Sequence, residues 1–201
     1  DAENWSEDSI YNYLSKSRLF IGKKGPEALS GTGNYILPVY ASDGTDKINA
    51  LLYCMDSNDY TADAEKYGNY AWIDWGQIAW YREQSRQYTT KNNGNPLPAL
   101  AFFHIGVPEF KHLQNRPDMY GHLGEGGGFP KINSGMFQSM IEMGDVMGVF
   151  VGHDHDNDYI AQEYGIALGY GRVSGHDAYG DLERGARIIE LFEDGRQFDT
   201  W

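Results

Sequence analysis

Short apolar runs and one stretch of helical spacing dominate the pattern along this chain. Residues 97–103 and 146–152 are almost continuously apolar, which is typical of short strands buried on both faces of a sheet. Between residues 70 and 88, Trp72 and Trp75 recur at helical spacing among polar residues. This spacing predicts an amphipathic helix whose tryptophans pack in the core.

Shorter patterns predict the remaining elements. Ser6 precedes two acidic residues and predicts the N-cap of a short helix that ends near Leu14. Residues 35–40 and 48–55 flank a Ser-Asp-Gly-Thr turn and predict a β-hairpin, with Pro38 at an edge or a bulge. The other predicted elements are a helix at 135–143, which Asn133 and Ser134 can cap, and strands at 166–170 and 186–192.

The glycine-rich segment 115–133 has little periodicity and predicts a long surface loop over 121–128. A second loop is predicted at 176–180. Neither an internal repeat nor a linker divides the chain. The order of strands and helices therefore predicts an α/β fold, in which a mixed sheet is packed against the two longer helices.

Composition and charge narrow the classes of function. A hydrophobic content of 41% and an aromatic content of 14% suit a globular protein, and no apolar stretch approaches the roughly 18 residues that span a bilayer. The 16 basic and 29 acidic residues give a net charge of −13, which opposes unassisted binding to nucleic acid or an anionic membrane. The single cysteine, Cys54, lies in an apolar run and is expected to be a buried, unreactive thiol.

Three histidines stand where buried strands are predicted to end. His104 follows the run 97–103, and the Gly-His-Asp-His motif at 152–155 follows the run 146–151. Imidazole is a common ligand of divalent metals, and residues i and i+2 at a strand end point to opposite sides, so His153 and His155 could each face one of two ions. The alternative is that both are solvated loop residues.

Further segments share a likeness to one family of enzymes: 104–110, 152–155, 52–57, and the helix positions Gln77 and Trp80. Together they resemble the calcineurin-like metallophosphoesterases, and in particular their purple-acid-phosphatase-like branch in plants, fungi and bacterial relatives. The likeness runs from about residue 34 to residue 187.

The resemblance implies that this chain is the C-terminal lobe of a metallophosphoesterase β-sandwich with flanking helices. It implies a two-metal site in which His104 and His153 hold one ion and His155 the other, the metals being Zn, Mn or Fe. The implied reaction is hydrolysis of a small phosphate monoester by a hydroxide that the metals activate, with a phosphodiester as the alternative. A secreted or periplasmic location is also implied.

A few other residues could contact or support that site. Asp154 could brace His153 from behind, and the family tends to carry a histidine where His176 lies, although a solvated loop residue is the alternative. Arg172 could bind a phosphate but is expected to be exposed. Glu109 is expected to face water, and no chemical role is expected for His112 and His122.

The departures from the family pattern are as informative as the matches. The family's Asp-x-His, Gly-Asp and Gly-Asn-His motifs are incomplete here, and residues 1–3 look like those that follow the last of these histidines. We therefore expect residues 1–201 to be one partial domain that lacks the N-terminal lobe and is inactive as given. The alternatives are a non-catalytic binding module with relic histidines, and a homo-oligomer formed through the face that the missing lobe would cover.

Overall fold

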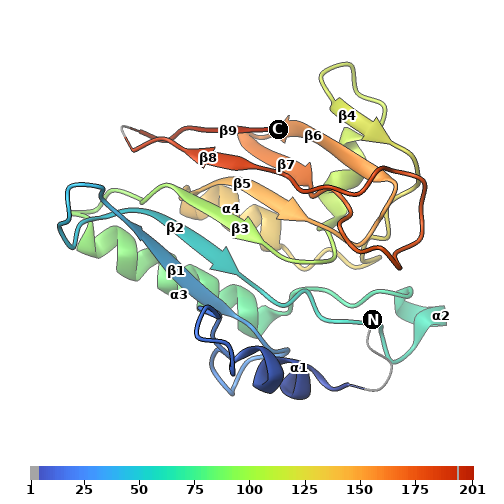
Figure 1. Cartoon of the computed structure of the whole chain (residues 1–201), viewed down its shortest axis with the longest axis horizontal. Helices are drawn as coiled ribbons and strands as arrows, with labels where there is room; N and C mark the ends of the chain where they lie inside the picture. The colour runs from blue at the N-terminus through green and yellow to red at the C-terminus, as the bar shows by residue number, and fades with distance from the viewer. Residues whose placement is uncertain (1–4, 194) are drawn as a thin grey trace.

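The architecture of residues 5–193 and 195–201, which the computed structural model describes, is a sheet with layers on both faces (Figure 1). The helices are α1 (Glu7–Leu14), α2 (Ala64–Tyr67), α3 (Trp75–Lys91) and α4 (Met136–Met143), with a 3-10 helix, η1, at Pro108–Leu113. The strands are β1 (Tyr35–Tyr40), β2 (Ile48–Cys54), β3 (Ala99–Phe102), β4 (Tyr120–Leu123), β5 (Val146–Val151), β6 (Asn157–Glu163), β7 (Ile166–Tyr170), β8 (Ile189–Leu191) and β9 (Phe198–Thr200).

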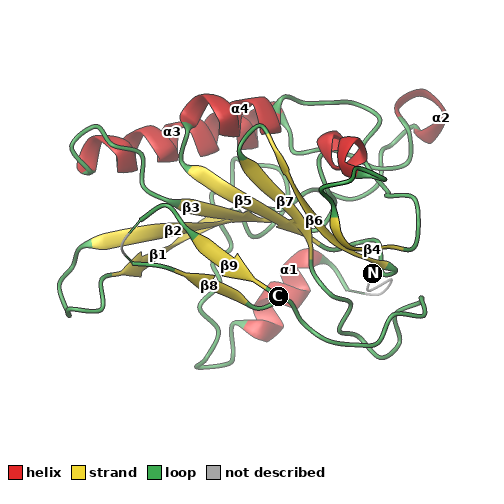
Figure 2. Ribbon diagram, turned by 90° about the horizontal axis from the view of Figure 1, so that it is seen from above, coloured by secondary structure: helices red, strands yellow, loops and turns green. Residues whose placement is uncertain are grey.

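Seven strands form one mixed sheet in the order β1-β2-β3-β5-β7-β6-β4. The central strands β2, β3, β5 and β7 run parallel, whereas β1, β6 and β4 pair antiparallel with their neighbours. Helices α3 and α4 cover one face, and the two-stranded sheet β8-β9 lies on the other (Figure 2). The α/β class with a mixed sheet is confirmed.

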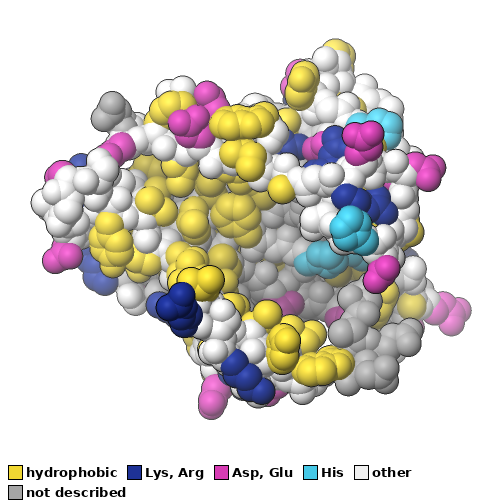
Figure 3. Space-filling view, viewed as in Figure 1, with side chains coloured by type: hydrophobic (Ala, Val, Ile, Leu, Met, Phe, Trp, Pro, Cys, Tyr) yellow, Lys and Arg dark blue, Asp and Glu magenta, His cyan; other side chains and the backbone are white. Residues whose placement is uncertain are grey.

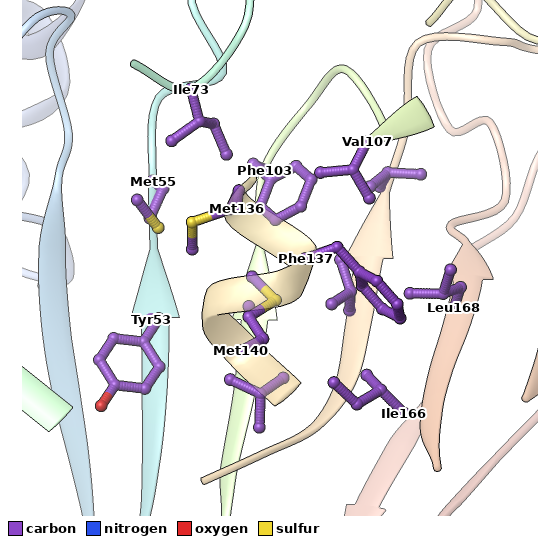
Figure 4. Close-up of a cluster of buried hydrophobic side chains, with 14 of the residues drawn as sticks. Tyr53, Met55, Ile73, Phe103, Val107, Met136, Phe137, Met140, Ile166 and Leu168 are labelled. Atoms are coloured by element: carbon purple, nitrogen blue, oxygen red, sulfur yellow. The ribbon is translucent and has the colours of Figure 1, made fainter. Parts of the chain in front are cut away.

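Two apolar clusters hold these layers together. The larger one fills the space between the sheet and the helices α3 and α4, where Met136, Phe137 and Met140 of α4 face the strands (Figure 4). The smaller one contains Leu100 and Phe150 on the other face, against which β8 and β9 pack. Every residue of β5 and all but Phe102 of β3 are buried, which confirms the interpretation of the two continuous apolar runs.

The sheet face opposite the helices is only partly covered. In the view of Figure 3, apolar side chains gather in a hollow on this face. Leu52, Phe102 and Ile189 are among the partly buried side chains that pack there against the smaller cluster. No helix in the described residues combines the length and the apolar composition needed to cross a bilayer.

The prediction for helix α3 is wrong at its start. The helix begins at Trp75, because Asp74 forms a capping box with Gln77: the Asp74 side chain accepts from the Gln77 backbone, and the Gln77 side chain accepts from the Asp74 backbone. Trp72 therefore precedes the helix. Trp75 is 76% exposed, so the expected core position is also wrong.

Helix α4 has a different cap from the one expected. Its N-cap is Gly135, which has a left-handed φ of 85° and so suits glycine. The side chain of Asn133 instead accepts a hydrogen bond from the Gly135 backbone at 3.0 Å, one residue before the helix. By contrast, Ser6 caps α1 as predicted, accepting from the Ser9 backbone.

Three strands were not predicted: β4, β6 and β9. The segment 115–133, expected to be loop, contains β4, which pairs antiparallel with β6. β6 itself follows the histidine motif in a stretch where no strand was predicted, and only Asn157, Tyr159 and Ala161 of it are buried. The strand expected at 186–192 is shorter, forming β8, and pairs with the unpredicted β9.

The predictions for the β1-β2 hairpin and for Cys54 have different outcomes. The hairpin β1-β2 is confirmed, and Pro38 lies in β1 at the edge of the sheet. Cys54 is half-buried rather than fully buried, and desolvation raises the pKa of its thiol, which keeps it protonated and weakly reactive at neutral pH. Residues 1–3, which resemble a family motif, lie outside the described residues.

A buried carboxylate joins helix α3 to the sheet. Asp145, 1% exposed and directly before β5, accepts hydrogen bonds from the hydroxyls of Tyr53 on β2 at 2.7 Å and Tyr81 on α3 at 2.5 Å. The two tyrosine rings meet edge to face with centroids 5.1 Å apart. Three elements are thus fixed to one polar group inside the apolar core.

We expect Tyr81→Phe to lower the free energy of unfolding by about 2 kcal/mol, because a hydrogen bond to a charged group contributes about 1.5–3 kcal/mol. The control is Tyr88→Phe, which removes a hydroxyl from a half-buried tyrosine on the same helix and should cost less than about 0.5 kcal/mol. Urea denaturation at neutral pH measures both. Equal losses in the two variants would contradict the assigned role of Asp145.

Candidate functional site

The parallel register of β3 and β5 places two histidines at one edge of the sheet. Phe102 pairs with Phe150, and past the strand ends the Gly152 backbone donates to the His104 carbonyl at 3.0 Å. Nε2 of His104 and Nδ1 of His153 lie 3.4 Å apart, and their rings are nearly perpendicular with centroids 5.2 Å apart. The structure therefore brings together two of the three histidines predicted to bind metal.

His153 sits in a strained turn and a closely fitted socket. Its φ is 75°, a left-handed value that is uncommon for a residue with a side chain and is often found at functional sites. The edge of the Tyr70 ring packs against it with a centroid distance of 4.6 Å. On another side the backbone of Gly128 approaches so closely that an added Cβ would lie 2.7 Å from Nε2 of His153.

Asp154 is buried behind the histidine pair, with 6% of its surface exposed. One carboxylate oxygen accepts from the Tyr170 hydroxyl at 2.6 Å, and the other accepts from the Gly128 backbone at 2.9 Å. Desolvation raises the pKa of Asp154, and these two donors oppose that rise. Asp154 therefore lies behind His153 and reaches it through Gly128, and its supporting role stays a prediction.

His155 lies against Tyr179, away from the contact between His104 and His153. The rings of His155 and Tyr179 stack with centroids 4.0 Å apart, and Nδ1 of His155 is 3.2 Å from the Tyr179 carbonyl oxygen. The Tyr179 hydroxyl in turn donates to the Glu125 carboxylate at 3.0 Å. His153 and His155 thus face different neighbours, and Nδ1 of His155 is turned to the loop that carries Tyr179.

The other sequence-predicted residues are placed as follows. His176 is exposed in the loop after β7. Arg172 is bonded to the Asp158 carboxylate at 2.7 Å, so the expectation of a freely exposed arginine is wrong. Glu109 accepts from the Asn133 side chain at 2.7 Å instead of simply facing water. His112 and His122 are both exposed, on η1 and on β4.

Sequence reasoning missed four residues that shape the site: Tyr70, Glu125, Tyr170 and Tyr179. Tyr170 ends the buried strand β7, which neighbours the strand that precedes His153, so its position at the strand end could have indicated a hydroxyl near the site. The other three lie outside the named strands and helices: Tyr70 precedes α3 in the segment that was wrongly predicted to be helical, and Glu125 and Tyr179 lie in loops. Their roles depend on contacts across loops, which no local pattern encodes.

A pocket beside the histidine pair has an acidic lining. Besides His104 and His153, it is lined by Glu7, Asp56 and Asp59, and by hydroxyl-bearing side chains. The Asp56 carboxylate accepts from the Thr32 backbone at 2.7 Å and so stays fixed at the pocket wall. This lining favours a cation over an anion near the imidazoles.

The spacing of the His104 and His153 imidazoles matches that of two ligands of one metal ion. Two nitrogens bound to a tetrahedral ion at about 2.0–2.1 Å lie about 3.3–3.4 Å apart, and the observed separation of His104 and His153 is 3.4 Å. Although His104 is open to solvent on one side, desolvation and the neighbouring His153 lower its pKa, so it is neutral and able to bind. In the described part of the chain, however, no three His, Cys, Asp or Glu side chains are grouped to hold a metal. A complete two-metal centre is therefore not formed by these residues alone.

The sequence is similar to two Arabidopsis thaliana proteins named probable inactive purple acid phosphatases 29 and 28. It is 35% identical to the former over 190 residues, covering 88% of this chain and 49% of that protein. It is 36% identical to the latter over 179 residues, covering 86% of this chain and 44% of that protein. The curated relatives of this chain are purple-acid-phosphatase-like proteins. A further relative is the Saccharomyces cerevisiae phosphatase DCR2, 30% identical over 190 residues, which covers 85% of this chain and 31% of that protein.

The chain spans about half, or less, of the length of the curated relatives it matches, and it corresponds to their C-terminal portion. Neither a family model nor a solved structure matches it. The family resemblance inferred from the histidine motifs is confirmed by these relatives. The sheet with its helices is consistent with the C-terminal lobe of that fold.

We expect Gly128→Ala to displace the His153 ring, because the added Cβ would lie 2.7 Å from Nε2 of His153 and 3.0 Å from the Tyr70 ring. Both neighbours are side chains that can move, so the free energy of unfolding should fall by less than about 1.5 kcal/mol. Changes in the NMR signals of the His153 ring measure the displacement.

Gly126→Ala is the matched control, because an added Cβ at Gly126 would meet no described atom within 4 Å. It should leave both the His153 signals and the unfolding free energy unchanged. Unaltered His153 signals in Gly128→Ala would contradict the close fit between the glycine loop and the imidazole.

Proposed function

We propose that His104 and His153 supply two ligands to the metal centre of a phosphoesterase, and that this chain alone does not complete that centre. The observation that carries the proposal is the 3.4 Å separation of two imidazole nitrogens at the ends of neighbouring parallel strands. Carboxyl ends of parallel strands are where α/β sheets present reactive groups. The proposed inactivity rests on the absence of a third grouped donor among the described residues.

The surroundings of the pair support a cation there. A separation of 3.4 Å is long for a direct hydrogen bond between two rings, which prefers 2.7–3.2 Å, and suits two ligands that share an ion. The acidic lining of the adjacent pocket adds attraction for a cation. When bound, zinc, manganese or iron would polarise a phosphoryl oxygen and lower the pKa of a water. The two histidines of this chain would hold and orient the ion.

The proposed substrate of the whole protein is a small phosphate monoester. The name of the yeast relative, a phosphatase, supports a phosphate ester in general. A protein with a net charge of −13 needs a local cation to attract such an anion, which the proposed metal would supply. A phosphodiester is the alternative, and bis-p-nitrophenyl phosphate separates the two in the whole protein.

A second candidate is a non-catalytic member of the family, in which the histidines remain without turnover. The two Arabidopsis thaliana relatives are named probable inactive purple acid phosphatases. Metal binding without hydrolysis by the whole protein would support this second candidate.

We expect this chain to bind about one equivalent of Zn²⁺ or Co²⁺, measured by calorimetry or by the Co²⁺ absorption bands. His104→Ala and His153→Ala should each weaken binding at least tenfold, since losing even a supporting partner of a ligand costs about 10–100-fold. His122→Ala, on the exposed strand β4, is the control and should bind as the parent does. Equal binding by all variants would contradict the ligand roles.

We also expect no hydrolysis of p-nitrophenyl phosphate by this chain with Mn²⁺ or Zn²⁺, because the described residues leave the centre incomplete. The release of nitrophenolate is the measurement. Turnover that disappears in His153→Ala would overturn the proposed inactivity while supporting the metal site.

The proposed homo-oligomer would use the partly covered sheet face. Apolar side chains gather there in a hollow, and burying them between two copies would remove apolar surface from water (Figure 3). Light scattering tests this, and a strict monomer at high concentration would contradict it.

A further inference from the structure

We propose that Tyr170 is a positioning residue for His153 that acts through Asp154 and Gly128. The inference deepens the proposed function, on which it rests for its importance to metal binding. Its structural basis is independent of any metal. A continuous path of contacts leads from a rigid strand end to the ring that the proposed site requires.

The path begins at Tyr170, a buried side chain packed between two aromatic rings. Tyr170 ends β7 and is fully buried. The Phe110 ring meets the Tyr170 ring edge to face at a centroid distance of 5.3 Å, and the Tyr159 ring lies 4.9 Å away. These contacts fix the ring, so its hydroxyl has a defined position from which it donates to Asp154 at 2.6 Å.

Asp154 transmits that position to the glycine-rich loop. Its carboxylate is held between the Tyr170 hydroxyl and the Gly128 backbone N–H, with donor distances of 2.6 and 2.9 Å. The group is 6% exposed, so water cannot readily replace a lost partner. Removing the hydroxyl of Tyr170 would leave Gly128 bound to a carboxylate that is free to turn.

The last step is the contact between Gly128 and the imidazole. An added Cβ on Gly128 would come within 2.8 Å of two atoms of the His153 ring, so the loop backbone forms one wall of the socket. His153 itself has a φ of 75°, a conformation that persists only where the surroundings enforce it. Its neighbour in the chain, Asp154, supplies that constraint by anchoring the turn to β7.

Tyr170→Phe tests the proposal because it removes the hydroxyl and keeps the ring. In the metal-free chain, the wild-type His153 ring should give one sharp set of C–H signals by NMR, and in Tyr170→Phe these signals should broaden or shift. Affinity for Co²⁺ should fall about 10–100-fold, the usual effect of losing support for a ligand. Asp154→Ala should act in the same way, and the double variant should add little, since both residues act on one path.

Tyr53→Phe is the matched control. Tyr53 is also fully buried, and its hydroxyl donates to a different buried carboxylate, Asp145, at 2.7 Å. It should leave the His153 signals and the Co²⁺ affinity unchanged, even if it lowers stability as much as Tyr170→Phe does in urea. Unchanged His153 signals in Tyr170→Phe, or equal changes in both variants, would overturn the positioning role.

The two readouts separate this inference from the proposed function. If the wild-type chain binds no Co²⁺ while Tyr170→Phe alters the His153 signals, the metal proposal fails and the positioning role stands. If the wild type binds Co²⁺ and Tyr170→Phe changes neither affinity nor signals, the positioning role fails and the metal proposal stands.

Discussion

The parallel pairing of β3 with β5 is the constraint on which the site depends. Both strands are deeply buried, so their backbone groups must bond to neighbouring strands, and this requirement fixes their register. The pairing continues past the strands, where Gly152 donates to the carbonyl of His104. That last bond holds the two chain segments together beyond the strand ends, and this explains why the ring nitrogens of His104 and His153 lie only 3.4 Å apart.

The parts of this arrangement that could be predicted from sequence are those with a strong local pattern. Apolar runs revealed β3, β5 and β7, and their ends correctly located His104 and His153 at one edge. The start of helix α3 was predicted five residues too early, because the spacing of Trp72 and Trp75 suggested a helix that includes both, whereas the capping box at Asp74 begins it at Trp75. The strands β4 and β6 were not predicted, because β4 buries no residue fully and β6 buries only Asn157, Tyr159 and Ala161, so neither sequence alternates clearly between apolar and polar residues.

Contacts between loops account for what the sequence could not predict about the site. The side chain of His155 is engaged by Tyr179, which lies 24 residues further along the chain. Glu125 joins the same group by accepting from the Tyr179 hydroxyl and from the Asp156 backbone. A rule of alternating side-chain directions along a strand does not apply here, since the chain turns at His153 with a left-handed φ of 75°.

The two histidines of the motif thus meet different environments, although only one residue separates them. His153 faces His104 and an acidic pocket, within a socket that Asp154 and Gly128 maintain. Two imidazoles held at the spacing of a shared ion lose little conformational freedom when that ion binds. His155 is stacked on Tyr179 with Nδ1 turned to the Tyr179 carbonyl, which leaves Nε2 as the nitrogen that an ion could reach. An ion on the His104–His153 pair and an ion on His155 would therefore occupy separate positions, each beside a ring whose orientation protein contacts already fix.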